Sequence, residues 1–295
     1  FGGGALKVDF TKDACNRLQQ RFNADVTAIE EDMKGCVWIA TNKGQVWRST
    51  STVLSENTSF VPWTKGIKVN ENYRIYKDRN GCLWLGDEHA GVLYIDPVTE
   101  KVESYKLAPA GRTNFSASIR QFCLDSRNRL WIATAEGLIL FDSKGNTSRL
   151  VQLEDKGVKV KDVRAVAEDK EGNIWVGTNL GLKRIDVQGT DITLFGNYER
   201  DAGLNVSPVN FIYVNSYNQI FASYSDKIFR IDGREKDKVE SVFTLMNGLS
   251  SGHIFCMVDD QNGNTWLGSN SGIMTIRNDR TTFYDYALFG DCDED

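Results

Sequence analysis

The sequence predicts an all-β fold, a β-propeller of four-stranded antiparallel blades with six complete repeats and a partial seventh blade. Three observations lead to this prediction. An aromatic residue recurs at a blade-sized period, a turn signal recurs just before it, and short strand-like runs separate the turns. Blades arranged radially cover one another's apolar faces and leave only short edges exposed.

The aromatic residue sets the period of the repeat. It returns at intervals of 46, 47, 44, 46 and 45 residues, as Trp38, Trp84, Trp131, Trp175, Phe221 and Trp266. A large amphipathic ring at this place is expected to be structural, wedged between adjacent blades, with the indole N–H donating to a carbonyl. A ladder of sugar-stacking rings is the functional alternative, but equivalent buried positions in every blade cannot all face one ligand.

A turn signal precedes each aromatic residue. Six positions before the ring stand Asp32, Asp78, Asp125, Asp169, Asn215 and Asp260, and three before it stand Gly35, Gly81, Asn128, Gly172, Asn218 and Gly263. This D-x-x-G pattern predicts a tight hairpin turn in which the Asp or Asn side chain accepts backbone N–H groups. The fourth residue then needs a positive φ, which glycine supplies freely and asparagine tolerates. We assign the aspartates a structural role.

The rest of each copy reads as three further strands. A small residue follows the aromatic by two positions, and a second turn ends at Gly44, Gly91, Gly137, Gly181 and Gly272. In the fourth copy the expected strands are 163–168, 173–178, 182–186 and 191–195, and no segment has a helical period. A linear β-solenoid is the alternative, but its rungs are usually much shorter than this repeat.

The two ends of the chain predict an incomplete blade. Residues 5–9 match the third strand of a repeat, a fourth strand is expected near 17–22, and the last strand of the sixth copy is expected at 283–288. We therefore expect a single propeller over 1–295, with a partial blade at 1–22, six repeats at 23–290 and an acidic tail at 291–295. Because the chain opens with Phe1, we expect it to be a piece of a longer protein.

Composition excludes several classes of function. The net charge of −5 and pI near 5.3 give no basic face for nucleic acid, so we expect no nucleic-acid partner. Six scattered cysteines and two histidines lack the spacing of a metal site, so neither a metal nor another cofactor is expected. Cys15 and Cys292 lie near opposite ends and would meet as a disulfide if the blades close into a ring.

The fourth copy carries a family resemblance. Its block Glu168-Asp-Lys-Glu-Gly-Asn-Ile-Trp-Val-Gly-Thr-Asn-Leu-Gly-Leu-Lys-Arg-Ile-Asp186 resembles the two-component regulator propeller repeat. Residues 125–142, 78–96 and 260–276 match nearly as well, and 32–48 match less closely. The fifth copy departs from the pattern, with Phe221, Tyr224 and Lys227 in place of Trp, Thr and Gly. Its second turn is therefore expected to differ in shape.

The resemblance implies a function that the repeat spacing does not. Such repeats typically form the extracytoplasmic sensor half of bacterial hybrid two-component proteins, and many of those sensors respond to oligosaccharides. The resemblance implies a periplasmic location, an oligosaccharide ligand, and the rest of the receptor chain as partner, with a homodimer as one form of assembly. Kinase activity would belong to the parent chain, and this part would not be an enzyme.

Candidate ligand-binding residues lie where the second turns and the long connections between blades are expected to share one face. Arg74, Arg120 and Arg164 near the starts of the first strands would suit a carboxylate or sulfate. The alternative is that they pair with nearby acids such as Glu30, Asp162 or Glu168, or simply extend into solvent. Aromatic residues in or beside the connections would stack on sugar rings or else pack the loops: Trp63, Tyr73, Phe115 and Tyr198.

Two alternative functions remain open at this stage. His89 and His253 lie in loops of the same face, and streptogramin-type lyases of a related propeller group use a face histidine with a divalent metal. Residues 262–266 partly resemble the Asp-box of glycosidase propellers, but no acid pair can be nominated. A lyase or hydrolase is thus one alternative, and a protein-binding scaffold of the WD type is the other.

Overall fold

The computed structural model describes residues 6–9, 14–17, 22, 24–55, 58–68, 71–109, 115–155, 157–188, 191–195, 206–225, 227–232, 239–244, 254–260, 262–269, 272–277 and 280–285. All of its regular elements are strands, and the chain is a β-propeller with six four-stranded antiparallel blades, as the repeat predicts. Within the described ranges, none of the structure is a helix of the length and hydropathy that a membrane span requires.

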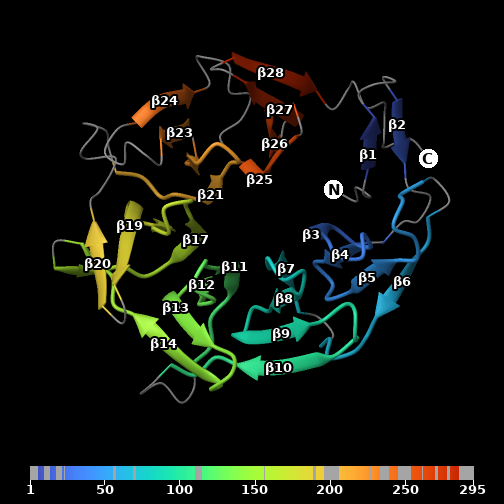
Figure 1. The fold of residues 1–295 in the computed structure, drawn as a ribbon, viewed down its shortest axis with the longest axis horizontal. Helices are drawn as coiled ribbons and strands as arrows, with labels where there is room; N and C mark the ends of the chain where they lie inside the picture. Colours follow the sequence, from blue (N-terminus) through green and yellow to red (C-terminus); the bar gives the residue numbers. More distant parts are fainter. Residues whose placement is uncertain are drawn as a thin grey trace. The chain divides into compact units, whose positions relative to one another are not determined.

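The first three blades follow the sequence in simple order (Figure 1). Blade 1 consists of β3 (Val26–Glu31), β4 (Val37–Thr41), β5 (Val46–Ser49) and β6 (Phe60–Trp63). Blade 2 consists of β7 (Arg74–Lys77), β8 (Leu83–Gly86), β9 (Gly91–Ile95) and β10 (Val102–Lys106). Blade 3 consists of β11 (Ile119–Leu124), β12 (Leu130–Thr134), β13 (Gly137–Asp142) and β14 (Thr147–Val151).

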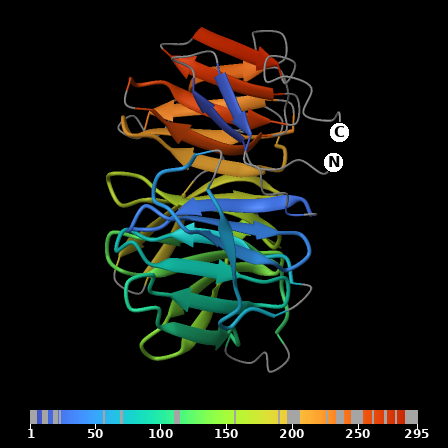
Figure 2. The same cartoon turned by 90° about the vertical axis from the view of Figure 1, so that its right-hand side faces the viewer.

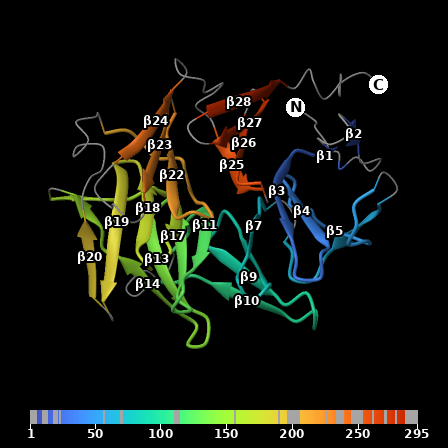
Figure 3. The same cartoon turned by 45° about the horizontal axis from the view of Figure 1, so that its top comes forward.

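The other three blades repeat this order, and Figure 3 displays the strands of blade 4 beside one another. Blade 4 consists of β17 (Val163–Glu168), β18 (Ile174–Thr178), β19 (Gly181–Gln188) and β20 (Asp191–Phe195). Blade 5 consists of β21 (Phe211–Val214), β22 (Gln219–Ser223), β23 (Lys227–Asp232) and β24 (Val239–Thr244). Blade 6 consists of β25 (Ile254–Asp259), β26 (Thr265–Ser269), β27 (Gly272–Arg277) and β28 (Arg280–Asp285).

Two short hairpins complete the strands. The antiparallel pair β1 (Leu6–Asp9) and β2 (Ala14–Arg17) occupies the segment predicted to be a partial blade, with β2 earlier in the chain than expected. The strand β28 also begins three residues before its predicted start. The hairpin β15 (Glu154–Asp155) and β16 (Val158–Lys159) lies in the connection before blade 4 and was not predicted, although Gly157 with a φ of 80° marks its turn.

The chain divides into two compact units. Unit 1 holds 1–124, 141–149 and 289–295, and unit 2 holds 125–140 and 150–288. In unit 1 the first strand of blade 1 contacts that of blade 2, and β7 contacts β11. In unit 2, β17 contacts β21 and β21 contacts β25. In these four pairs the blades meet through the strand before the D-x-x-G turn, and Figure 2 gives the same strands in a view turned by 90°.

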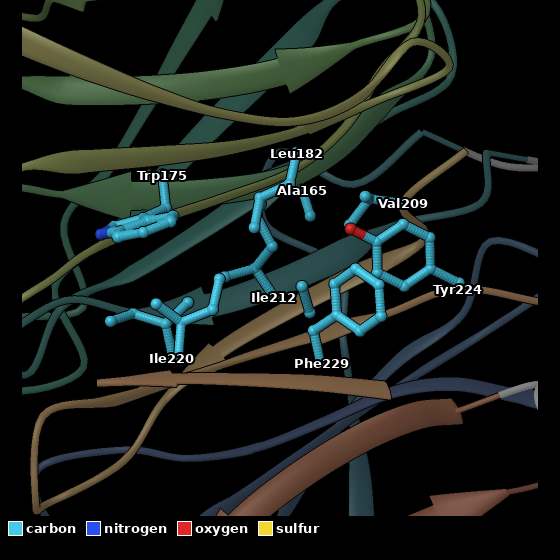
Figure 4. Packing of buried hydrophobic residues seen from close by; sticks show 10 residues of the cluster. Ala165, Trp175, Leu182, Val209, Ile212, Ile220, Tyr224 and Phe229 are labelled. Atoms are coloured by element: carbon cyan, nitrogen blue, oxygen red, sulfur yellow. The ribbon is translucent and has the colours of Figure 1, made fainter. Parts of the chain in front are cut away.

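Apolar clusters fill seams between blades, and three of them contain a repeated aromatic ring. In unit 2, Trp175 of blade 4 packs with Ile212 and Ile220 of blade 5 (Figure 4). Phe221 of blade 5 packs in the same way against Met257 of blade 6. In unit 1, Trp38 belongs to a cluster with residues of blade 2. The predicted position of the ring, between adjacent blades, is confirmed.

The partner of the indole N–H differs from the prediction. In each of the five blades that have Trp, the N–H donates 2.8–2.9 Å to the aspartate six residues earlier, not to a carbonyl. In blade 4 the Oδ1 of Asp169 accepts the backbone N–H groups of Glu171 and Asn173, while Oδ2 accepts the Trp175 indole. A charged acceptor is already buried at this point to close the turn, so it also serves the ring.

The conformation of the first turn agrees with the sequence. Its fourth residue has a positive φ in all six blades, including Asn128 at 61° and Asn218 at 64°, where asparagine replaces glycine. The N–H of this residue donates to the carbonyl of the Asp or Asn that opens the turn, as between Gly172 and Asp169 at 3.0 Å. The D-x-x-G pattern therefore codes for a hairpin turn with a left-handed fourth residue.

Candidate functional site

The second turns and the connections lie together at one face in each unit, as predicted. In unit 1, the Ala90 N–H donates 2.9 Å to Ala117 O, and the Ile119 N–H donates 3.0 Å to Asp87 O. In unit 2, the Asp162 N–H donates 3.1 Å to Ala135 O. The connections into blades 3 and 4 are thus fixed by backbone hydrogen bonds to the second turn of the preceding blade. Side chains from both segments can face the same ligand.

A side-chain hydroxyl bonds across the second turn in several blades, and blade 2 has a carboxylate in its place. In blades 3, 4 and 6 a Thr or Ser hydroxyl donates 2.7–2.9 Å to the glycine carbonyl three residues on. Blade 2 has Asp87 at this position, with a side chain only 2% exposed. Its Oδ1 accepts the N–H groups of His89 at 2.9 Å and Gly91 at 2.5 Å, and its Oδ2 accepts Lys68 Nζ at 3.2 Å. Blade 2 therefore has a buried carboxylate where those blades have a hydroxyl.

Further polar side chains surround Asp87 on this face of unit 1. His89 Nδ1 lies 3.0 Å from the Glu71 carboxylate, and Asn72 Nδ2 donates 3.4 Å to Glu88 Oε1. The His89 side chain is 63% exposed, so this pair is accessible to solvent. The sequence singled out His89 as a candidate, but it did not single out Lys68, Glu71 or Glu88. The signal for this cluster was Asp87, at a position that four of the other five copies fill with Thr or Ser.

Arg74 and Arg120 occupy neighbouring first strands in unit 1. Arg74 Nη1 donates 2.9 Å to the carbonyl of Thr27, which belongs to blade 1. Desolvation lowers the pKa of Arg74; Glu88 opposes this shift and the positive charge of Arg120 adds to it. Arg74 therefore experiences the charges of both Glu88 from the second turn and Arg120 from the next blade.

Arg164 lies in unit 2 and makes different contacts. Its Nε and Nη2 donate 3.1 and 3.0 Å to Asp162 Oδ2, and its Nη1 donates 2.6 Å to Asn210 Oδ1 of blade 5. The alternative in which this arginine pairs with a nearby acid therefore holds at Arg164.

Arg164 also marks a feature of the strand that sequence reasoning missed. The pairing of β17 with β18 shifts at this residue, and the same shift occurs at Thr27 in β3 and Phe255 in β25. A β-bulge there re-aims the side chain. These residues are five positions before the turn Asp, so the bulge directs an equivalent side chain in each of these blades.

The aromatic candidates lie mainly in packed positions. Tyr73 is 1% exposed, and its hydroxyl accepts the Lys68 N–H at 2.9 Å. Burial raises the pKa of this hydroxyl, partly offset by that hydrogen bond. Phe115 is 5% exposed, and Trp63 is half-buried with its ring 4.9 Å from that of Trp38. The packing alternative therefore describes these three rings.

Several sequence candidates fall outside the described residues or side chains. Tyr198 and His253 are in this group, and so is the predicted disulfide between Cys15 and Cys292. Within the described part of the chain, no group of three or more His, Cys, Asp or Glu side chains has the arrangement of a metal site. What the described face offers is a set of carboxylate, amide, ammonium and guanidinium groups, which can hydrogen-bond to hydroxyl or anionic groups of a ligand.

Comparison with known proteins gives the repeat a family. The model described as two-component regulator propeller matches residues 20–43, 157–180 and 248–271. These stretches hold the first strand and first turn of blades 1, 4 and 6. A curated relative, "Histidine kinase P4" of Formosa agariphila, is 24% identical over 277 residues, covering 72% of this chain and 20% of the relative. The chain spans about a fifth of that protein's length.

Solved structures share the fold. Two extracellular domains from B. thetaiotaomicron, both assigned to hybrid two-component systems, have TM-scores of 0.72 and 0.70 at 22% and 18% identity. The chain is covered to 90% and 88% and spans 34% and 36% of those chains. The virginiamycin B lyase of Staphylococcus aureus has a TM-score of 0.61 at 14% identity, with 87% and 84% of the two chains covered. Three stretches of this chain therefore match the two-component regulator propeller repeat.

Proposed function

We propose that this chain is the ligand-sensing propeller of the extracytoplasmic part of a hybrid two-component receptor. The observation that carries the proposal is the match of its repeats to the two-component regulator propeller model. The relative named as a histidine kinase and the two extracellular domains of similar fold support the same assignment. The receptor would place this propeller in the periplasm, with the rest of its chain, or a second copy, as protein partner.

The proposed ligand is an oligosaccharide. The face formed by second turns and connections presents hydrogen-bonding groups of several kinds, including Lys68, Glu71, Asn72 and Glu88 in unit 1. Sugars carry many hydroxyl groups that both donate and accept hydrogen bonds, and such side chains suit them. The proposed role of the chain is binding without turnover, so that the ligand acts by changing the population of receptor states.

A lyase is the second candidate, because the virginiamycin B lyase shares the fold and an exposed His89–Glu71 pair lies on the same face. A histidine beside a carboxylate can act as a general base. This candidate makes a different prediction from the sensor, because a bound saccharide would be consumed and His89→Ala would abolish the reaction.

A thermal-shift screen of defined oligosaccharides against the receptor ectodomain, with product analysis of every hit, tests the proposal. The sensor predicts a saccharide that raises Tm and is recovered intact. A ligand present at 100 times its Kd stabilises the folded state by about 2.7 kcal/mol, which is a shift of several degrees. Failure of every saccharide to raise Tm contradicts the proposal, and products that vanish in His89→Ala establish the lyase instead.

A further inference from the structure

Three polar side chains of unit 2 form one hydrogen-bond network at the face of the second turns. Arg164 donates 3.1 and 3.0 Å from Nε and Nη2 to Asp162 Oδ2, and 2.6 Å from Nη1 to Asn210 Oδ1. Asn210 Nδ2 donates 3.5 Å to Ser225 Oγ in the second turn of blade 5. The Asp162 carbonyl accepts the Asn179 N–H at 3.2 Å. The network is therefore fixed to the second turns of blades 4 and 5.

The network is polar but balanced in charge. The Arg164 guanidinium makes two bonds to one carboxylate oxygen of Asp162, and the two side chains are 31% and 26% exposed. The neighbouring Lys161 is balanced as well, because its Nζ lies 3.7 Å from Glu136 Oε2. Three of the five guanidinium N–H groups of Arg164 serve these contacts among the described residues, which leaves two for a ligand.

An exposed aromatic ring occupies the equivalent place in the next blade. Arg164, Asn210 and Phe255 each stand five residues before the Asp or Asn that opens the first turn, in blades 4, 5 and 6. Phe255 is 65% exposed, whereas Tyr73 at this place in blade 2 is 1% exposed. The bulge in β25 falls at Phe255, as the bulge in β17 falls at Arg164, and a bulge re-aims the side chain. A large apolar group left in water indicates a contact surface.

The packing of blades 4, 5 and 6 places these three positions next to one another. Strand β21 contacts β17 on one side and β25 on the other, and Figure 1 shows the three strands in this order. Phe211, which follows Asn210, packs against the apolar cluster that contains Ile254, which precedes Phe255. Ile254 pairs with the last residue of β26, so Phe255 lies at the end of β25 beside the second turn of blade 6. The blade-to-blade step that joins Arg164 to Asn210 is thus repeated between Asn210 and Phe255.

We infer that Arg164, Asn210 and Phe255 form a binding site for a neutral pyranose ring of the ligand. Such a ring carries hydroxyl groups that donate and accept hydrogen bonds, and the C–H groups on one of its faces are apolar. Arg164 and Asn210 bond the hydroxyl groups, and the apolar face stacks on Phe255. An acidic saccharide is disfavoured, because its anion would meet the Asp162 carboxylate together with the guanidinium. This inference rests on the proposed function and names the class of sugar.

The test compares single variants of the receptor ectodomain by calorimetry. Phe255→Ala removes the ring and Asn210→Ala removes the amide, while Phe255→Trp keeps an aromatic surface. The matched controls are Tyr217→Ala and Asn262→Ala, which change exposed residues in the first turns of blades 5 and 6. The neutral probes are cello-, xylo-, manno- and galacto-oligosaccharides. An oligogalacturonate and a chondroitin sulfate oligosaccharide are the acidic probes.

The inference predicts that a neutral oligosaccharide binds, and that Phe255→Ala and Asn210→Ala each lower its affinity at least about ten-fold. Both controls and Phe255→Trp should keep the affinity within about three-fold of the native value. Phe255→Ala should leave the Tm of the unliganded protein unchanged, because the ring is exposed. Equal affinity in all variants, or binding of acidic saccharides alone, overturns the inference while leaving the sensor proposal intact. If no saccharide binds, both fail.

Discussion

At the scale of single residues, one carboxylate joins the first turn to the ring in the seam in each of the five blades that have Trp. Asp125 is fully buried and Asp169 is 3% exposed, and each uses Oδ1 for two backbone N–H groups and Oδ2 for the indole. Blade 5 has exchanged both partners together. There Asn215 still closes the turn through Oδ1, and Phe221 has no N–H to be satisfied. The two replacements fit the hydrogen-bonding role of the Asp, because a blade without the indole N–H needs no second acceptor oxygen.

We predict that Asp169→Asn destabilises the protein by about 2–3 kcal/mol. The amide offers a single acceptor oxygen, so either the turn or the Trp175 N–H loses its partner in a buried place. Urea unfolding measures the loss, with the exposed Asp142→Asn as a control expected within about 0.5 kcal/mol of the native protein. In the Trp175→Phe background, Asp169→Asn should cost less. Equal costs in both backgrounds would mean that the indole bond contributes nothing.

The free energy of unfolding should fall at low pH because of Asp260 in blade 6. Desolvation acts to raise the pKa of Asp260, but hydrogen bonds from Asn264, Trp266 and the backbone outweigh it and hold the pKa well below its usual range. A carboxyl with a lowered pKa stabilises the folded state above its unfolded pKa, near 3.9, and loses this contribution as pH falls further. Urea unfolding from pH 6 to pH 3 should show a decline that is smaller in Asp260→Asn. Identical slopes would contradict the assignment.

The sequence predicted the residues of this Asp–Trp arrangement but not the hydrogen bond between their side chains. The recurrence of Asp and Trp six positions apart predicted a turn and a buried ring, and both are present. It did not reveal that the two side chains bond to each other, because a spacing does not say which way a ring nitrogen points. The aromatic candidates Tyr73 and Phe115 show the same limit, since a loop position in the sequence does not reveal that the ring folds back into the core.

At the scale of elements, the turns and the seams impose different demands on glycine. Gly172 has a φ of 80°, and a Cβ there would meet no atom closer than 3.8 Å, so backbone conformation alone requires it. Gly177 lies two positions after the ring, and a Cβ there would be 2.8 Å from Val209 Cγ1 of the segment that leads into blade 5. The small residue after the ring therefore lets the next blade approach in blade 4, as Gly86 does in blade 2, where a Cβ would be 2.4 Å from Ile119 Cγ2.

We predict that Gly172→Ala costs about 1–2 kcal/mol, because an L-residue with a side chain pays that amount in the left-handed region. Gly172→Asn should cost less, since Asn128 and Asn218 hold the same conformation in blades 3 and 5. Urea unfolding of the two variants gives the order. If Asn is no better than Ala, the conformational explanation for the fourth residue is wrong.

Strand positions were predicted well wherever the turn signals are strong. In blade 4 the expected strands 163–168, 173–178 and 191–195 match the structure within one residue, and the third strand runs to Gln188, two residues beyond its prediction. The bulge at Arg164 was not predicted, because it arises from pairing between strands and has no signature in one strand's composition. For the same reason, the direction of the candidate arginine side chains could not be read from their spacing.

At the scale of the whole molecule, the repeat determines the architecture and the departures from it indicate the candidate site. Asp32, Asp78 and their equivalents are the same in most blades, so we assign them a role in the stability of the fold. Asp87 and Arg74 differ from the residues at equivalent places in the other blades, so they are positions where one blade can acquire a ligand. The resemblance of the repeats predicted the family of the matching model, and the contacts of individual side chains were needed to compare the candidate residues.

Hydrogen exchange of the ectodomain, with and without a saccharide that raises Tm, tests the central claim most directly. The account predicts slower exchange in the second turn 87–91 and at 117–120 when the saccharide binds, unchanged exchange in the first turn 78–82, and recovery of the saccharide intact. Protection confined to the first turns, or conversion of the saccharide to product, would contradict a sensor that binds its ligand at this face.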